Sequence, residues 1–200
     1  MAGPRAVQSV GPWAAAVAAS WLAVAAACAV LAVLDPEPDL RHPAVTISAR
    51  YSVWAWFAAC GVMLVLWPGE WRELGPRVRF ARLLWTLGLA MHVVHVLFAF
   101  GLAHRWSHAA AVEHVAAAGG FGWTIAVNYL FAATWAADVL WWWANPTGYA
   151  NRPRWVGRAV HGFLAFVVFN AAVVFGPPGW RVVDAALFGV LAVLWWRRTR

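Results

Sequence analysis

The sequence has no lysine, few acidic residues and only two cysteines. Charged residues make up 12% of the chain and hydrophobic residues 64%, which excludes the composition of an ordinary soluble domain. The two cysteines, Cys28 and Cys60, lie in separate apolar runs at different predicted depths. A disulfide needs Cα atoms within about 7 Å. We therefore expect both to be free thiols that pack as small apolar residues.

Several signatures of catalysis are also missing from the sequence. It contains no Gly-x-Ser-x-Gly segment, phosphate-binding loop or Rossmann fingerprint, and its acidic residues are too scattered for a paired-carboxylate mechanism. Prolines do not interrupt the apolar runs, and the two halves do not match, unlike many transporters. A non-enzymatic protein is therefore favoured, and a structural or accessory membrane subunit without a cofactor is one interpretation.

Apolar runs of about 20 residues recur along the chain and predict transmembrane helices. The predicted fold class is an all-α, polytopic transmembrane helical bundle with six spans, in one integral membrane domain over residues 1–200. The predicted spans are approximately 12–34, 45–67, 80–103, 120–143, 156–176 and 180–196. The last run is the shortest, so five spans remain an alternative.

The fifteen arginines predict the orientation of these spans. With the N-terminus inside, the inner segments carry eleven arginines and the outer segments four. The positive-inside rule then places both termini in the cytoplasm of a bacterial inner membrane. Because the arginines flank apolar runs, the net charge of +7 indicates contact with the lipid bilayer and its anionic headgroups, and no nucleic acid is expected as a partner.

The first apolar run, "WAAAVAASWLAVAAACAV", is rich in alanine. Small residues at four-residue spacing allow close helix approach. This helix is expected to pack tightly against a neighbour, either within the bundle or in a homo-oligomer or membrane complex.

A few polar side chains fall inside the predicted spans, where an ionisable group usually faces protein or water. They form a predicted intramembrane polar network of Asn128, Asp138, His161 and Asn170. By depth, Asp138 and His161 lie at one level and are expected to pair, with Arg82 and Arg158 as competing partners. This group either holds two spans together or serves a proton relay in a small proton-linked transporter.

Five of the seven histidines fall between residues 91 and 115. His104 and His108 are four residues apart, a spacing that lets one helix offer two imidazoles to a metal. Ser107 is expected to cap a new helix that carries further ligands. The candidate metal site consists of His104, His108, His114 and Glu113, with His92 and His95 as the alternative, and suits zinc, copper or iron. Solvated histidines at the interface are the other interpretation.

Haem b is a further alternative for the histidines. A b-type haem needs histidines from two facing helices at equal depth. Apart from the pair His92 and His95, the other spans offer only His161, about 10 Å nearer the inner face. Only an asymmetrically ligated haem fits this spacing.

The segments "HVLFAFGLAHRWSHAAAVEH", "GFGWTIAVNYLFAATWAADVLWWW" and "NRPRWVGRAVHGFLAFVVFN" carry a family resemblance over roughly residues 90 to 176. They resemble an uncharacterised group of bacterial polytopic membrane proteins. The shared features match Trp106 to Ala110, Asn128 with Tyr129, and Asp138 with Trp141 to Trp143. The resemblance implies a membrane location and no particular activity, and it draws attention to His108, Asn128 and Asp138 as one constellation.

Overall fold

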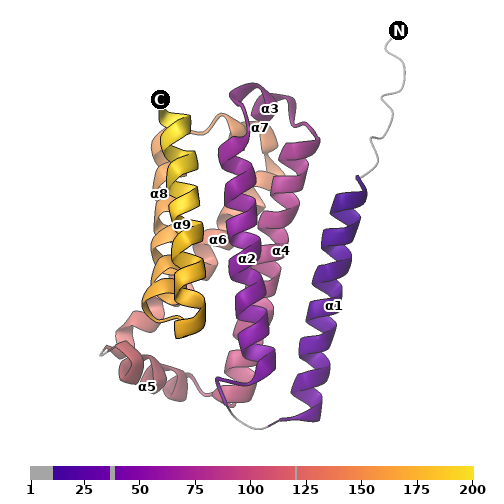
Figure 1. Ribbon diagram of the computed structural model, residues 1–200. Coiled ribbons are helices and arrows are strands. Elements are labelled where there is room, and N and C mark those ends of the chain that lie inside the picture. The colour runs from indigo at the N-terminus through magenta and orange to yellow at the C-terminus, as the bar shows by residue number, and fades with distance from the viewer. Residues whose placement is uncertain (1–10, 37–38, 120) are drawn as a thin grey trace.

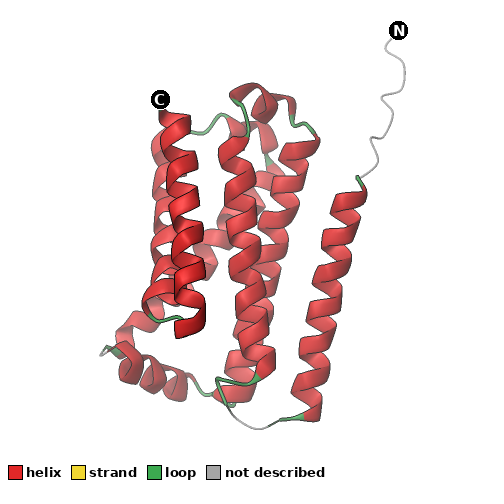
Figure 2. Cartoon of the chain, viewed as in Figure 1, coloured by secondary structure: helices red, strands yellow, loops and turns green. Residues whose placement is uncertain are grey.

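Long helices run side by side in the computed structural model, joined by short loops (Figures 1 and 2). The structure describes residues 11–36, 39–119 and 121–200. All regular secondary structure in these residues is helical, so the predicted all-α class is confirmed. The α-helices are α1 (Pro12–Leu34), α2 (Pro43–Val65), α3 (Pro68–Glu73), α4 (Pro76–Phe98), α5 (His108–Gly119), α6 (Ile125–Ala144), α7 (Pro146–Ala150), α8 (Arg154–Phe169) and α9 (Pro178–Thr199).

Short π-helical or 3₁₀-helical turns adjoin three of these helices. A π-helical turn, Ala99–Ala103, continues α4, and another, Asn170–Val174, continues α8, while the 3₁₀ turn Gly122–Thr124 precedes α6. Prolines stand in the first turn of six of the nine α-helices of the described residues. At that position the missing proline N–H is no loss, because the first-turn N–H groups of a helix have no partner within the helix.

Within the part of the chain that the structure describes, four helical segments are long and apolar enough to cross a membrane: Pro12–Leu34, Pro76–Ala103, Arg154–Val174 and Pro178–Thr199. The bent pair His108–Ala117 and Gly122–Ala144 adds a fifth if it is counted as one span. α2 has 23 residues and occupies the place of the predicted span 45–67, but it is less apolar, and it carries Arg50. The helices are those of an integral membrane protein. By helix length and composition the described residues provide four or five spans, whereas the sequence predicts six.

The core lies where α2, α4, α6 and α8 meet, and it is rich in aromatic rings. Trp85 and Trp135 are almost fully buried, with ring centroids 5.1 Å apart. Gly88 permits this packing, because a Cβ at that position would lie 2.9 Å from the Trp135 ring and 3.3 Å from the Cβ of Ala55. Cys28 and Cys60 are both buried free thiols, as expected.

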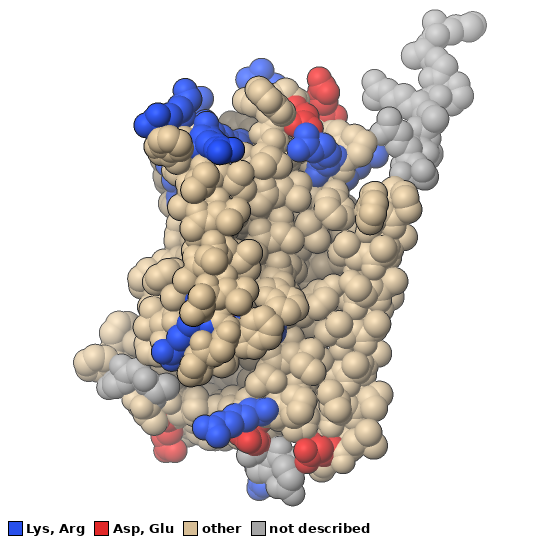
Figure 3. Space-filling model, viewed as in Figure 1, with Lys and Arg blue, Asp and Glu red and all other residues tan. Residues whose placement is uncertain are grey.

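On the face shown in Figure 3, charged side chains are few along the middle of the molecule and gather mainly toward its two ends. Many large hydrophobic side chains on the long helices are exposed, among them Leu22, Leu97, Leu140 and Phe166. Such a continuous apolar surface suits contact with lipid. α1 begins and α9 ends at the end that carries α3 and α7, while α5 lies across the opposite end (Figure 1).

Candidate functional site

The strongest concentration of buried polar groups surrounds Asp138, on the inward face of α6. The residue is 3% exposed. Its carboxylate accepts hydrogen bonds from Trp85 Nε1 of α4 (3.0 Å) and from the hydroxyl of Tyr149 in α7 (2.8 Å). Arg152, in the turn before α8, donates to the other carboxylate oxygen at 2.7 Å. Both oxygens of Asp138 are therefore bonded, and the charge is matched by a guanidinium.

The loop after α6 places Tyr149 and Arg152 beside this carboxylate. Asn145 ends α6, and its side chain accepts a hydrogen bond from the Gly148 N–H at 2.8 Å, which starts the short helix α7. The Tyr149 ring then stacks on Trp142 with centroids 4.5 Å apart and planes at 4°. Arg152 lies over the Tyr149 ring, with Cζ 3.8 Å from its centroid. A tight turn thus folds a polar loop back against the membrane-facing helices.

His161 joins the network through Arg152. One guanidinium nitrogen of Arg152 lies 2.8 Å from His161 Nε2, and because arginine can only donate, this nitrogen of His161 is the acceptor. The imidazole ring also packs on Trp85, at 5.2 Å between centroids. The structure therefore brings Asp138 and His161 to one arginine rather than into direct contact. We name the group Asp138, Arg152, His161, Tyr149 and Trp85 the Asp138 network.

Tyr149 stays protonated within this network. Burial, followed by the charge of Asp138, raises the pKa of the Tyr149 hydroxyl well above its ordinary value, while Arg152 opposes the shift. The phenol therefore stays neutral across the physiological pH range and donates a hydrogen bond to Asp138. Together with the arginine it leaves the carboxylate fully hydrogen-bonded, which a buried charge requires.

The other expected partners of Asp138 lie elsewhere. Arg82 stacks on Trp143, with Cζ 3.9 Å from the ring centroid, and Arg158 is exposed on α8. Asn170 donates to the carbonyl of Phe166 in its own helix at 2.7 Å, and Asn128 is exposed on α6. Among the described residues, neither asparagine forms a hydrogen bond with Asp138. His108, Asn128 and Asp138 thus do not meet as one constellation.

A second buried ion pair joins α2 to α9. Asp184 is fully buried, and Arg50 donates to its Oδ2 at 2.5 Å. The same guanidinium lies 4.8 Å from the ring centroid of Trp180. Asp184 lies near the start of the predicted span 180–196, and Arg50 lies 134 residues earlier, in the predicted span 45–67.

The expected metal ligands at the outer end do not converge. The rings of His104 and His114 lie 5.6 Å apart, but His108 Nδ1 lies 2.8 Å from the hydroxyl of Tyr129. Over the described residues, no group of three or more His, Cys, Asp or Glu side chains is placed to hold a metal ion. The metal site predicted at His104, His108, His114 and Glu113 is therefore not supported, because α5 turns His108 toward α6 instead of toward the other two histidines.

The alternative ligands His92 and His95 face helices that offer no further histidine ligand. His95 Nδ1 lies 3.0 Å from the carbonyl of Val45, so it carries the proton and donates. The His92 ring packs against Phe131 and Trp135, at 5.0 and 6.0 Å between centroids. His161, the other candidate for haem, is engaged by Arg152. These contacts favour structural roles for the three histidines over haem ligation.

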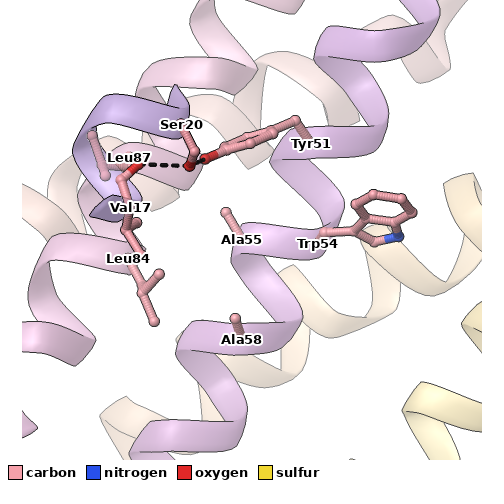
Figure 4. A pocket seen from close by; sticks show the side chains of 8 residues that line it. All are labelled: Val17, Ser20, Tyr51, Trp54, Ala55, Ala58, Leu84 and Leu87. Atoms are coloured by element: carbon pink, nitrogen blue, oxygen red, sulfur yellow. Dashed lines mark hydrogen bonds between the residues drawn. The ribbon is translucent and has the colours of Figure 1, made fainter. Parts of the chain in front are cut away.

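A hollow of about 190 Å³ opens between α1, α2 and α4 (Figure 4). Its lining is mostly apolar, including Val17, Ala55 and Leu84. At one edge the hydroxyls of Ser20 and Tyr51 lie 2.8 Å apart and tie α1 to α2. The hollow marks the side on which α1 packs loosely, and it offers no charged group to a ligand.

No family model, curated protein or solved structure matches this chain. The resemblance to a bacterial membrane-protein group over residues 90 to 176 therefore stays a prediction.

Proposed function

We propose that this chain is a six-span protein of the bacterial inner membrane that acts as a structural or accessory subunit, without catalysis of its own. In this proposal both termini are cytoplasmic, and the Asp138 network locks α4, α6 and α8 together at the inner level of the membrane. The observation that supports it most is the closure of this network: every oxygen of Asp138 is hydrogen-bonded, and its charge is paired.

The closed network favours a structural role over proton transport. A carboxylate that carries protons must alternate between a charged and a neutral state and must meet water. Asp138 is instead tied to Arg152 by a salt bridge of 2.7 Å, and the residue is 3% exposed. A proton-linked carrier that uses Asp138 and His161 would have to break the contacts of Arg152 in each cycle.

The partner surface in this proposal is α1. Only Ala14 and Cys28 of this helix are buried, so one side meets α2 and α4, and the rest is free. Exposed alanines recur on the free side at four-residue spacing, at positions 15, 19, 23 and 27. Stripes of small residues let membrane helices approach closely. A second copy of the chain, or a helix of another subunit, fits this face.

A test of the structural role replaces Asp138 with asparagine. The change leaves the buried Arg152 without its counter-charge, and breaking a buried pair in this way costs about 3–5 kcal/mol. We expect the melting temperature of the detergent-purified protein to fall by roughly 10 °C. The double variant Asp138→Asn with Arg152→Gln is expected to recover part of this loss, because neither charge remains.

The control is Glu73→Gln, which neutralises an exposed carboxylate at the end of α3 and should leave the melting temperature unchanged. The same variants are reconstituted into vesicles with an internal pH dye. If the wild-type protein carries protons, and Asp138→Asn abolishes the flux at an unchanged melting temperature, the carrier function replaces the structural one.

A further inference from the structure

Arg82 is a cation near one end of α4 that forms no ion pair with a carboxylate of the described residues. Among the described residues, ion pairs form only at Arg50, Arg77 and Arg152. Arg82 is half-buried, and its one hydrogen bond reaches the carbonyl of Trp142 at 3.5 Å, the outer limit for such a bond. Desolvation of a guanidinium at a membrane boundary is costly, and an anionic partner offsets this cost.

The surroundings of Arg82 hold its side chain in place. Its Cζ lies 3.9 Å from the centroid of Trp143, and Trp143 Nε1 in turn donates to Thr86 Oγ1 at 2.9 Å. The Thr86 hydroxyl donates to the carbonyl of Arg82 at 2.8 Å, which closes a small ring of contacts between α4 and α6. The indole is thus oriented by a hydrogen bond, and it acts as a platform that fixes the guanidinium.

A second arginine lies one turn earlier on the same face of the helix. Arg79 is exposed, and its Nε donates to the carbonyl of Leu74 at 3.2 Å, so its remaining donors are free for an anion. Residues three apart on a helix are neighbours. Arg79 and Arg82 therefore present two guanidinium groups to one site, and guanidinium groups bind phosphate oxygens in a bidentate manner.

The depth of this pair suits a phospholipid headgroup. α4 and its π turn run over 28 residues, about 42 Å, which exceeds a hydrocarbon core of about 30 Å. Arg82 lies six residues after Pro76, about 9 Å along the helix, so its side chain reaches back to the headgroup boundary. Eleven residues further on, exposed Val93 occupies the same face, about 16 Å deeper, which is the reach of one acyl chain.

We propose that Arg79, Arg82 and Trp143 form a binding site for one anionic phospholipid where α4 packs against α6. The phosphodiester contacts both arginines, and an acyl chain lies along α4 toward Val93. The site requires that α4 is embedded in a membrane. It does not depend on the proposed orientation, which decides only that the lipid belongs to the cytoplasmic leaflet. It is independent of the accessory role, which can fail while this site stands.

Native mass spectrometry of the delipidated protein tests the site, with dioleoyl phosphatidylglycerol and dioleoyl phosphatidylcholine as probes. We expect wild-type protein to retain phosphatidylglycerol over phosphatidylcholine. Arg82→Gln is expected to lower phosphatidylglycerol retention about fivefold, the effect of one arginine near an anionic headgroup. Arg72→Gln is the matched control, since Arg72 is an exposed arginine of α3, and it should leave retention unchanged.

Three results would overturn the proposal. Equal retention of the two lipids by the wild-type protein means that no headgroup is selected. Equal losses in Arg82→Gln and Arg72→Gln mean that only diffuse charge attracts the lipid. Displacement of phosphatidylglycerol by inorganic phosphate means that the site binds a free anion rather than a lipid. If Arg82→Gln does not fold, Arg79→Gln takes its place in the comparison with Arg72→Gln. The preference of the wild-type protein for phosphatidylglycerol over phosphatidylcholine is measured in either case.

Discussion

Buried carboxylates paired with arginines tie this protein together at the scale of single residues. Asp138 meets Arg152, and Asp184 meets Arg50, each within hydrogen-bonding distance. A buried ion pair contributes little net stability, but an unpaired buried charge is strongly destabilising. The two pairs therefore disfavour any helix arrangement that separates their members, and so they select the arrangement of α2 with α9 and of α6 with the turn before α8.

Sequence reasoning found Asp138 and missed its partner Arg152. Asp138 and His161 were placed at one depth from helix rise alone. Arg152 was missed because it lies in "ANPTGYANRPR", a segment with the composition of a solvent-exposed loop. The Asn145 cap and the aromatic Tyr149 were the available signals that this loop folds back, since a tyrosine ring beside a tryptophan run has an apolar surface on which to pack.

His104 and His114 give a prediction for pH. Burial, followed by the neighbouring His114, lowers the pKa of His104. A lowered pKa means that the folded state favours the neutral ring of His104. The contribution of this preference to the free energy of unfolding is present above about pH 6.5 and is lost as the pH falls through the pKa of His104 in the folded protein. We expect His114→Gln to raise the pKa of His104, because it removes the repulsion between the two rings.

A histidine NMR titration of the purified protein measures this shift, with the His104 signal assigned by its loss in His104→Gln. His108→Gln is the control, because His108 contacts Tyr129 and does not contribute to the shift of His104. Equal changes in both variants would contradict a specific effect of His114.

At the scale of elements, α1 stands apart from the other long helices. It meets α2 and α4 through one narrow side, tied by the Ser20–Tyr51 bond and by Trp21 Nε1, which donates to the Leu87 carbonyl at 3.0 Å. The other side carries the exposed alanines. The alanine-rich run predicted a closely packed helix, but it could not show which side of the helix the rest of the chain would occupy.

We expect the α1 alanines to mediate self-association. Ala19→Ile together with Ala23→Ile places branched side chains on the stripe and prevents close approach of a second helix. The molar mass of the protein in mild detergent, measured by light scattering with the detergent contribution subtracted, is expected to fall from that of an oligomer to that of a monomer. Ala192→Ile, at an exposed alanine of α9, is the control and should leave the mass unchanged. A monomeric wild-type protein would rule out a homo-oligomer.

At the scale of the whole molecule, the two ends of the helical array differ from each other in charge. The arginines of α3, those near the start of α4 and α8 and those near the end of α9 lie toward the end where α9 terminates (Figures 1 and 3). The prediction of six spans with this end in the cytoplasm follows from the positive-inside rule. It requires the turn before α5 and the loop of α7 to lie on opposite sides of the membrane.

Introduced cysteines test this orientation in intact bacterial cells. Ser107→Cys lies before α5 and Thr147→Cys in α7, and both positions are exposed. A membrane-impermeant maleimide is expected to label Cys at position 107 in intact cells and Cys at position 147 only after permeabilisation. The parent protein gives the background, which should be low because Cys28 and Cys60 are buried. Labelling of both positions from the same side would exclude the six-span arrangement.

The sequence by itself determined the helical class and the approximate bounds of the long helices. Apolar runs and prolines are local properties, and a helix satisfies its own backbone hydrogen bonds within one segment, so the pattern along the chain is sufficient. The predicted runs 12–34 and 156–176 correspond to α1 and to α8 with its π turn, to within two residues at each end.

Only the tertiary structure decided which polar side chains meet. Depth along a helix follows from residue number, but the direction in which a side chain points depends on how each helix is rotated and on which helices are neighbours. Asp184 therefore met Arg50 and not a nearer residue, and His108 turned to Tyr129 rather than to His104. Contacts between segments far apart in the chain are set by packing of the whole helical array, and no local pattern encodes them.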